Sequence, residues 1–386
     1  MTEMAAAEPA RQPWRTLRDR LLTSPRFQRL ARAFPLTRPL VRHYERQLFD
    51  LVAGFTYSQV LAAVVQLKVL DLLAEAPRSA DELSPHLGLA PGAAATLLDA
   101  ATALRLVERD AAGRYAPGLL GTVLRTQPGV QAMVEHHALL YADLADPVAL
   151  LRGQTRPTAL GRYWTYSGNP AAAQLTPAQV ASYSTLMSVT QQLIAGEILD
   201  AYPVGRHRCL LDVGGGEGSF LRAAAARAPQ LRLMLYDLPA VVARAQAGFA
   251  AAGLAGRAQC FAGDFRGAEL PRGADALSLI RVAFDHDDAT VLALLRAAHA
   301  ALEPGGTLLL AEPMAGATGA RRMGDAYFNF YLLAMQGGRS RSAADLSRLV
   351  QAAGFEQVRE LATPIPLQVS VLVARKPLHA TAPRSA

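Results

Sequence analysis

The sequence contains very little cysteine, very little lysine and no long apolar run. Its two cysteines, Cys209 and Cys260, exclude a disulfide scaffold and a cysteine-built metal site, and we expect no bound metal. Of the 39 basic residues only Lys68 and Lys376 are lysines, so 37 are arginines. No run of roughly eighteen apolar residues is free of charge, and the N-terminus lacks an apolar run with a cleavage site. We therefore expect neither a membrane span nor a secretory signal.

The rest of the composition is typical of a folded protein of more than one domain. Hydrophobic residues make up 51% of the chain and charged residues 18%, which excludes disorder. A length of 386 residues predicts two or three domains. The expected protein is cytoplasmic, and mostly helical or α/β.

Positive charge is concentrated in the first 47 residues. Ten arginines between residues 11 and 46 face only Asp19 and Glu45, so this segment carries +8 (ten minus two). Because the whole chain carries +7, the remainder sums to −1 (seven minus eight). Leucine and phenylalanine alternate with the arginines, partly at helical spacing, which predicts a basic amphipathic arm over residues 1–47. Two interpretations stay open: peripheral contact with an anionic membrane, and packing on its own protein or a twin subunit. Nucleic-acid binding is less favoured.

Residues 48–126 have the pattern of a winged helix. A long helix is expected from Phe55 to Ala74, and a capping box at residues 79–82 opens a second helix that ends at Gly88. A third helix starts at Pro91, and a hairpin with its turn near Gly113 follows. The third helix offers almost no long donors for bases or phosphates, so DNA binding is not predicted. Residues 127–202 are interpreted as helical connectors and substrate-pocket helices, interrupted by a loop over residues 153–170.

From residue 203 to 386 the chain repeats strand, turn and helix. Five buried strands are expected at residues 209–213, 231–236, 258–262, 276–281 and 306–312. Helices of ten or more residues separate them, which predicts a doubly wound parallel sheet. A last strand over residues 367–375 lacks a long crossover helix, so it is expected to pair antiparallel.

A glycine turn with acidic neighbours predicts a nucleoside cofactor at the ends of these strands. The turn contains Gly214 and Gly216 and opens a helix, where a ligand can approach the backbone closely. Asp212 precedes it and suits a cationic amine, and Asp237 ends the second strand, where a carboxylate accepts ribose hydroxyls. Asp264 and Phe265 end the third strand, suited to an adenine amino group and ring face. The spacing is not the Gly-x-Gly-x-x-Gly that holds a pyrophosphate, which favours S-adenosylmethionine (SAM) over NAD.

These features together resemble the SAM-dependent O-methyltransferases of the caffeate/hydroxyindole type. The resemblance covers about residues 48–376. It rests on the Leu-Asp-Val-Gly-Gly-Gly run at residues 211–216, Asp-Leu-Pro at 237–239, Gly-Asp-Phe at 263–265, Leu-Glu-Pro-Gly-Gly at 302–306 and Gly-Gly-Arg-Ser-Arg-Ser at 337–342. It implies a Rossmann-like methyltransferase sheet, a winged-helix domain that forms a homodimer, and Arg281 as a further cofactor residue.

The chain departs from that family where a phenol is normally deprotonated. The family pattern has a histidine base after the fourth strand, and this position is Phe284. His286 and Asp285 lie beside it, and Glu312, at the end of the fifth strand, matches the family pattern. These three residues are the catalytic candidates. A histidine base suits a phenol and not an aliphatic alcohol, whose transfer relies on alignment, desolvation and late proton loss.

Three longer strings resemble one branch of the family, which methylates the C-1 tertiary hydroxyl of acyclic hydroxycarotenoids (demethylspheroidene, 1-hydroxyneurosporene) in purple photosynthetic bacteria. They lie at residues 135–147, 281–287 and 325–341. The resemblance implies a hydrophobic carotenoid substrate and a place near the inner, photosynthetic membrane. An apolar tunnel is expected from His137, Met187, Phe284, Phe328, Tyr331 and Met335. Two alternatives stay open: methylation of a phenolic or polyketide hydroxyl, and a SAM-fold relative that binds or hydroxylates without methyl transfer.

Overall fold

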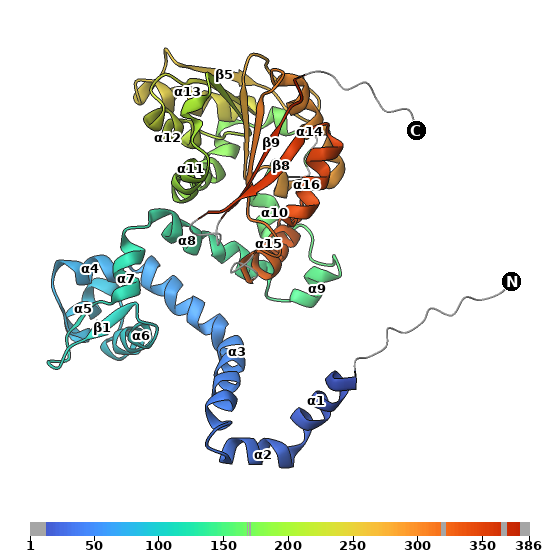
Figure 1. The fold of residues 1–386 in the computed structure, drawn as a ribbon. Coiled ribbons are helices and arrows are strands. Elements are labelled where there is room, and N and C mark those ends of the chain that lie inside the picture. Colours follow the sequence, from blue (N-terminus) through green and yellow to red (C-terminus); the bar gives the residue numbers. More distant parts are fainter. Residues whose placement is uncertain (1–12, 168, 170, 318–321, 364–368, 379–386) are drawn as a thin grey trace. The chain divides into compact units, whose positions relative to one another are not determined.

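The protein folds into two compact units, residues 1–121 and 122–386 (Figure 1). The structure is a computed structural model that describes residues 13–167, 169, 171–317, 322–363 and 369–378. Each unit has its own buried apolar core.

The N-terminal unit is a set of helices closed by a short antiparallel hairpin. The capping box of Ser79 and Glu82, the end of α5 at Gly88, and the start of α6 at Pro91 are as the sequence predicts. The long helix expected over residues 55–74 is wrong: α3 starts earlier and ends at Gln66, because Lys68 adopts a left-handed conformation and α4 starts anew. Its elements are α1 Pro13–Thr23, α2 Pro25–Ala33, α3 Arg38–Gln66, α4 Val69–Glu75, α5 Ala80–Leu87, α6 Pro91–Ala103, β1 Val107–Arg109 and β2 Tyr115–Pro117.

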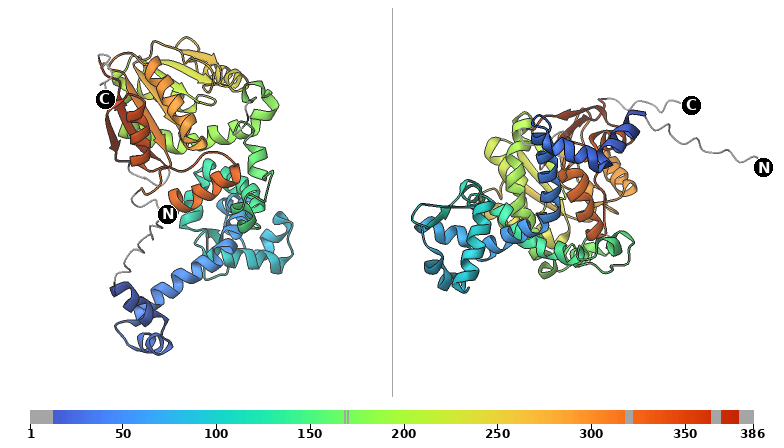
Figure 2. Two further views of the ribbon diagram at one scale, coloured as in Figure 1. Left: turned by 90° about the vertical axis from the view of Figure 1, so that its right-hand side faces the viewer. Right: turned by 90° about the horizontal axis from the view of Figure 1, so that it is seen from below.

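The C-terminal unit is a seven-stranded sheet with helices on both faces, which Figure 2 shows from two further sides. Its strands are β3 Cys209–Val213, β4 Arg232–Asp237, β5 Ala258–Ala262, β6 Ala276–Ile280, β7 Thr307–Glu312, β8 Glu356–Leu361 and β9 Ser370–Arg375. Its α-helices are α7 Leu119–Arg125 (entering from the first unit), α8 Pro128–Asp143, α9 Pro147–Leu151, α10 Ala159–Tyr163, α11 Pro177–Ala201, α12 Ser219–Arg227, α13 Pro239–Ala251, α14 Asp288–Ala301, α15 Phe328–Met335 and α16 Ala343–Ala352.

The strand order is β5-β4-β3-β6-β7-β9-β8, and the first five strands in that order are parallel. The five expected strands and the doubly wound class are confirmed, except that β5 is not buried, because it lies at the edge of the sheet. The last strand is also antiparallel, as expected: β9 pairs with β7 in register from Glu312↔Ser370 to Thr307↔Arg375. The predicted start of that strand, Leu367, lies outside the described residues. Strand β8 was not expected.

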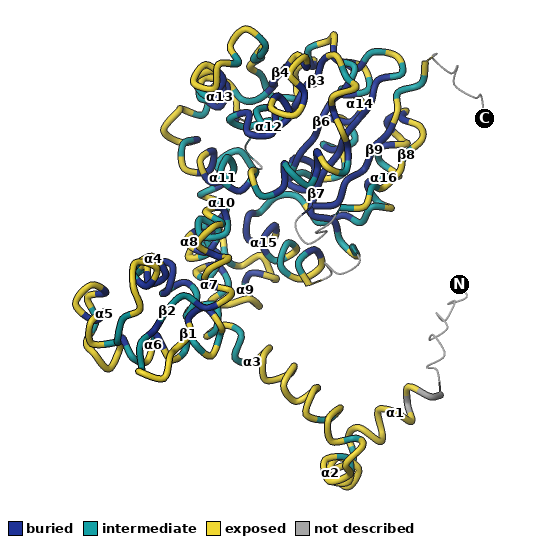
Figure 3. The backbone as a smooth tube through the Cα atoms, turned by 60° about the vertical axis from the view of Figure 1, so that its left-hand side comes forward, coloured by how far each residue is buried: buried dark blue, intermediate teal, exposed yellow. Residues whose placement is uncertain are grey.

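Two apolar cores hold the helices against the sheet. One joins the strands to α14 and α16, and the other joins them to α11, α12 and α13. Strands β3, β6 and β7 are buried along their whole length, which is why they are mostly apolar in the sequence (Figure 3).

A third apolar cluster gathers aromatic and aliphatic side chains from α8, α10, α11, α13 and α15. One expectation needs correction in this region. The loop expected over residues 153–170 contains α10, although residues 168 and 170 lie outside the described part. The segment that carries the expected tunnel residues Phe328, Tyr331 and Met335 is not one regular helix: a π-helical turn, Arg322–Tyr327, precedes α15.

Exposed apolar side chains are concentrated in α1, α2 and α3. Among the described residues, 14 of the 21 exposed large hydrophobic side chains lie between residues 17 and 55. Figure 3 shows these helices coloured mostly as exposed. Within the part of the chain that the structure describes, one helix, α3, is long and apolar enough to cross a membrane by length and composition, although no span was expected. A single such helix is weak evidence for a span, because the buried core helix of a soluble protein and a signal sequence meet the same criteria.

Candidate functional site

A cavity opens where the strand order reverses. Strands β4 and β5 lie on one side of β3, and β6 and β7 lie on the other, so β3 and β6 flank a topological switch point. Ligands of open α/β sheets bind at this place, at the carboxyl ends of the strands. The loops that follow β3, β4, β5 and β6 all line the cavity, together with α11 and the segment before it.

Asp212 lies at the floor of the cavity with one carboxylate oxygen unused. Its Oδ1 accepts a hydrogen bond of 2.6 Å from Ser278, whereas its Oδ2 is buried and has no partner among the described residues. Burial raises the pKa of Asp212 to about 7, partly offset by Ser278. A buried carboxylate oxygen without a donor is costly unless a ligand supplies one. The side chain therefore suits a cationic amine.

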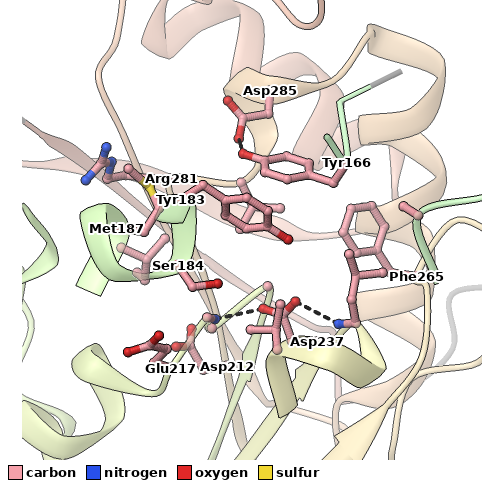
Figure 4. Close-up of a pocket in the computed structure, with 18 of the residues that line it drawn as sticks. Tyr166, Tyr183, Ser184, Met187, Asp212, Glu217, Asp237, Phe265, Arg281 and Asp285 are labelled. Carbon is pink, nitrogen blue, oxygen red and sulfur yellow. Dashed lines mark hydrogen bonds between the residues drawn. The ribbon is translucent and has the colours of Figure 1, made fainter. Parts of the chain in front are cut away.

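The glycine turn exposes bare backbone next to this carboxylate. Gly216 has a φ of +58°, which favours glycine, and a β-carbon built there would meet nothing within 4 Å. The backbone N–H of Gly216 donates to Asp237 Oδ2 at 2.7 Å, and that of Leu238 donates to Oδ1 at 2.7 Å. Burial raises the pKa of Asp237 to about 6, although these two hydrogen bonds act to lower it. The turn and Asp237 thus hold each other in place (Figure 4).

The cavity has a third acidic group, at the end of β5, that is already paired. Asp264 forms an ion pair with Arg266 at 2.6 Å. Burial acts to raise the pKa of Asp264, but hydrogen bonds from Arg266 outweigh it and lower that pKa. Phe265 lies next to it and contacts the ring of His286 edge-on at 5.2 Å. Burial and the nearby Arg266 lower the pKa of His286 to about 4, so its ring is neutral.

The facing wall carries residues that the sequence analysis missed. Tyr166 donates a hydrogen bond of 2.8 Å to Asp285 Oδ2, and Tyr183 lies beside Tyr166 with ring centroids 5.1 Å apart (Figure 4). The hydroxyl of Tyr183 is buried without a partner among the described residues. No motif in the sequence distinguishes these tyrosines, because one lies in an irregular segment and the other in a helix of unremarkable pattern.

Glu312 lies below the cavity rather than in its lining. Its Oε1 accepts hydrogen bonds from the backbone N–H groups of Val282 (3.0 Å) and Ala283 (2.7 Å). Burial raises the pKa of Glu312 to about 8. This catalytic candidate therefore contacts the backbone of the loop that precedes Asp285.

The same loop is held from the other side by the segment after α15. Arg341, 2% exposed, donates to the carbonyl oxygens of Ala283 (2.8 Å) and His286 (2.6 Å). The N–H of Arg339 donates to the carbonyl of Phe284 at 3.0 Å. Gly338 comes so close that a β-carbon there would lie 1.9 Å from that carbonyl oxygen.

The expected cofactor and substrate residues fall into two groups. Asp212, Gly214, Gly216, Asp237, Asp264, Phe265, Arg281, Asp285, His286 and Met187 line the cavity. Phe284, Phe328, Tyr331 and Met335 belong to the third apolar cluster, which Met187 joins from the cavity. His137 lies at its edge, hydrogen-bonded to the hydroxyl of Tyr327 at 2.7 Å.

The residues that line the cavity fit SAM, and they do not suggest a metal site. Asp212 has a free oxygen for the amine, the bare turn at Gly216 admits a ligand against the backbone, and Asp237 lies where a ribose would be held. Among the described residues, no three His, Cys, Asp or Glu side chains are grouped as metal ligands.

Comparison with protein families identifies both parts of the chain. Residues 141–356 match the O-methyltransferase domain, and residues 49–126 match the O-methyltransferase dimerisation domain. The chain belongs to the O-methyltransferase family. It is an enzyme, and the dimerisation domain supports the expected homodimer.

Individual relatives of this O-methyltransferase agree with that assignment. Demethylspheroidene O-methyltransferase of Cereibacter sphaeroides is 43% identical, over 94% of this chain and 95% of its own. The enzyme of that name from Rhodobacter capsulatus is 39% identical, over 92% of this chain and 88% of its own. Among solved structures, the S-adenosylmethionine-dependent methyltransferase SibL superposes with a TM-score of 0.72 at 26% identity, over 86% of this chain and 99% of its own. The expected cofactor, SAM, is confirmed.

Proposed function

We propose that this O-methyltransferase methylates the C-1 tertiary hydroxyl of acyclic hydroxycarotenoids such as demethylspheroidene and 1-hydroxyneurosporene. The observation that carries the proposal is the apolar residue at the family's base position. Phe284 is 7% exposed and meets Phe328 edge-on at 6.0 Å, within a cluster of aromatic and aliphatic side chains. Relatives named demethylspheroidene O-methyltransferase support the same substrate class.

In this proposal the cofactor is held by residues from the ends of four strands. Asp212 takes the amine, Asp237 the ribose hydroxyls, and Asp264 with Phe265 and His286 the adenine. Gly214, Gly216 and Arg281 complete the lining. Bound SAM supplies an electrophilic methyl group. The chain contributes orientation and a water-poor surface, and orientation alone is worth roughly 7–11 kcal/mol in favourable cases.

The acceptor would enter through the third apolar cluster. Met187, which lines the cavity, packs with Phe284, Phe328, Tyr331 and Met335 in that cluster, so the cavity and the cluster share a wall. Two polar atoms at this cluster are hydrogen-bonded: the hydroxyl of Tyr331 accepts from Trp164 Nε1 at 2.8 Å, and His137 Nε2 bonds the hydroxyl of Tyr327 at 2.7 Å. Satisfied polar groups of this kind leave a surface suited to a polyene chain.

The substrate is tested with purified enzyme, SAM and 1-hydroxyneurosporene in detergent micelles. We expect the methyl ether, identified by chromatography and mass spectrometry, and no product from N-acetylserotonin under the same conditions. Methylation of the phenolic compound alone would contradict the proposal. Tight SAM binding without transfer to any hydroxyl would favour a non-methylating relative.

We further propose that helices α1 and α2 make peripheral contact with an anionic membrane, where such a substrate dissolves. The arm exposes Leu17, Leu22, Leu30 and Leu36, whose side chains are 61%, 54%, 67% and 81% exposed, among its arginines. A basic helix with exposed apolar side chains lies at a lipid interface, and each arginine near an anionic surface contributes about 1 kcal/mol. The enzyme would then be cytoplasmic and attached to the photosynthetic membrane.

Deleting residues 1–37 leaves α3 whole and tests this attachment. We expect binding to vesicles containing phosphatidylglycerol to fall at least roughly tenfold, since several arginines are removed at once. Binding of the full chain should weaken as salt is raised, and binding to phosphatidylcholine vesicles serves as the control. If the shortened chain binds anionic vesicles as well as before but becomes monomeric in light scattering, the arm packs on the twin subunit instead.

A further inference from the structure

Two side chains on the cavity wall that faces Asp212 and Asp237 form a hydrogen-bonded pair. Tyr166 follows α10, and Asp285 follows β6, 119 positions later in the chain. The hydroxyl of Tyr166 donates to Asp285 Oδ2 at 2.8 Å, and both side chains line the cavity (Figure 4). Within the described part of the chain, Asp285 Oδ1 has no recorded hydrogen-bond donor, so the pair retains one acceptor site.

The other catalytic candidates are less suited to contact a reacting hydroxyl. His286 lies against Phe265 and is influenced electrostatically by Asp264 and Arg266, which places it at the end of the cavity assigned to adenine. Glu312 does not line the cavity, and its Oε1 is occupied by two backbone N–H groups. Asp285 is a carboxyl group that lines the cavity without contacting the glycine turn or Arg266.

We propose that Asp285 accepts the proton of the methylated hydroxyl, and that Tyr166 positions the Asp285 carboxylate for this step. The inference rests on the proposed function and adds to it the proton acceptor and a positioning residue. Asp285 is the catalytic residue, because it touches the reacting hydroxyl. Tyr166 acts through Asp285.

The step balances without any further reactant. The hydroxyl oxygen forms a bond to the methyl carbon, and the sulfur retains the electron pair of the methyl–sulfur bond that breaks. The oxygen carries a positive charge at that moment, and its proton passes to Asp285 Oδ1. The products are a neutral ether, a neutral thioether and a protonated carboxyl group, which returns its proton to water before the next turnover.

The surroundings of Asp285 set its pKa near neutral pH, which suits a proton acceptor. Burial raises the pKa of Asp285 to about 7, while the hydrogen bond from Tyr166 and the charge of Arg281 act in the opposite direction. Glu312, Tyr331 and Tyr183 are the other titratable groups near this pair. Burial raises the pKa of Glu312 to about 8, and burial also raises those of both tyrosines, so these three groups are largely neutral at pH 7.

The sign of the pH dependence follows from this chemistry. Only the ionised carboxylate can accept a proton, so kcat/KM should fall as the pH is lowered through about 7. Removing the Tyr166 hydroxyl takes away a hydrogen bond that stabilises the ionised form, so the pKa of Asp285 should rise. The acidic limb of the profile should then move to higher pH.

Single-turnover methyl transfer to 1-hydroxyneurosporene, measured across pH, tests the pair. Asp285→Asn should lower the rate by 10²- to 10⁴-fold, the range for loss of a general base, and should remove the limb near pH 7. Tyr166→Phe should keep much of the rate at high pH and shift the limb upward. The matched control is Tyr115→Phe, which removes a tyrosine hydroxyl that also donates to an aspartate (Asp99 Oδ1, 2.7 Å) but does not line the cavity.

Calorimetric titration with SAM separates the possible failures. Wild-type affinity in Asp285→Asn shows that the fold and the cofactor site survive the substitution. If the wild-type enzyme methylates no hydroxycarotenoid, the proposed function fails. If it does so and Asp285→Asn retains both its rate and its acidic limb, the proton acceptor lies elsewhere. If Tyr166→Phe shifts the limb no more than Tyr115→Phe does, Tyr166 does not position Asp285. Either result overturns this inference.

Discussion

Replacing Gly338 with alanine is expected to lower the free energy of unfolding of the C-terminal unit by about 2–5 kcal/mol. Gly338 has a φ of +73°, which costs an L-residue roughly 1–2 kcal/mol. The new β-carbon would also lie 1.9 Å from the carbonyl oxygen of Phe284 and 2.6 Å from the carbonyl carbon of Asp285. Both are backbone atoms that cannot rotate away, and overpacking of this kind adds about 1–3 kcal/mol.

Gly253→Ala is the matched control for that substitution. Its φ is +69°, nearly the same, but a β-carbon there would meet nothing within 4 Å. Gly253→Ala should therefore lower the free energy of unfolding only by the roughly 1–2 kcal/mol that a left-handed conformation costs an L-residue. The measurement is urea unfolding followed by the fluorescence of Trp164, with Trp14 replaced by phenylalanine in every variant. If the two alanine variants lose the same free energy of unfolding, the loop at Phe284 can shift to make room for the new β-carbon at little cost. Gly338→Ala should then also retain its methyl-transfer rate.

Asp237→Ala is expected to weaken SAM binding by roughly ten- to a hundredfold. The side chain accepts hydrogen bonds from Gly216 and Leu238 and lies where the ribose is placed. Losing hydrogen bonds to a charged acceptor costs about 1.5–3 kcal/mol, and each 1.4 kcal/mol corresponds to about a tenfold change in affinity. Isothermal titration calorimetry at pH 8, where Asp237 is ionised, measures the effect.

Two comparison variants make this result specific to the ribose position. Asp237→Asn keeps an oxygen that can accept from the glycine turn, so it should lose less affinity than the alanine variant. Asp264→Ala should lose less again, because Asp264 is already paired with Arg266 at 2.6 Å and must exchange that partner to bind a ligand. Unchanged SAM affinity in Asp237→Ala would refute the placement of the ribose.

The sheet could be predicted from the sequence because its strands are buried on both faces. Strands β3, β6 and β7 are mostly apolar and fully buried, and the glycine turn and acidic residues lie within or directly after strands, so both the fold and the cofactor carboxylates follow from local pattern. Strand β8 was missed because it lies at the edge of the sheet, and four of its six residues are exposed. The other edge strand, β5, is also partly exposed, but four of its five residues are apolar, so it could be predicted.

Features that depend on contacts distant in sequence could not be predicted. Tyr166 becomes meaningful only beside Asp285, and nothing in the irregular segment around it indicates that partner. The break between α3 and α4 occurs at Lys68, in a left-handed conformation that normally calls for glycine or asparagine. Tertiary packing of Val64, Val69 and Leu73, all nearly inaccessible to solvent, accounts for the break where local propensity does not.

The loop that carries Asp285 is unlike a mobile active-site loop, because it is held on two sides by groups from elsewhere in the chain. Glu312 binds the N–H groups of Val282 and Ala283, Arg341 binds the carbonyls of Ala283 and His286, and the backbone of residue 339 binds that of Phe284. Local unfolding would break these five bonds together, at roughly 1 kcal/mol each. Backbone amides in this loop should therefore exchange with deuterium nearly as slowly as those of the sheet. Asp285 would then keep its position in the cavity through every turnover.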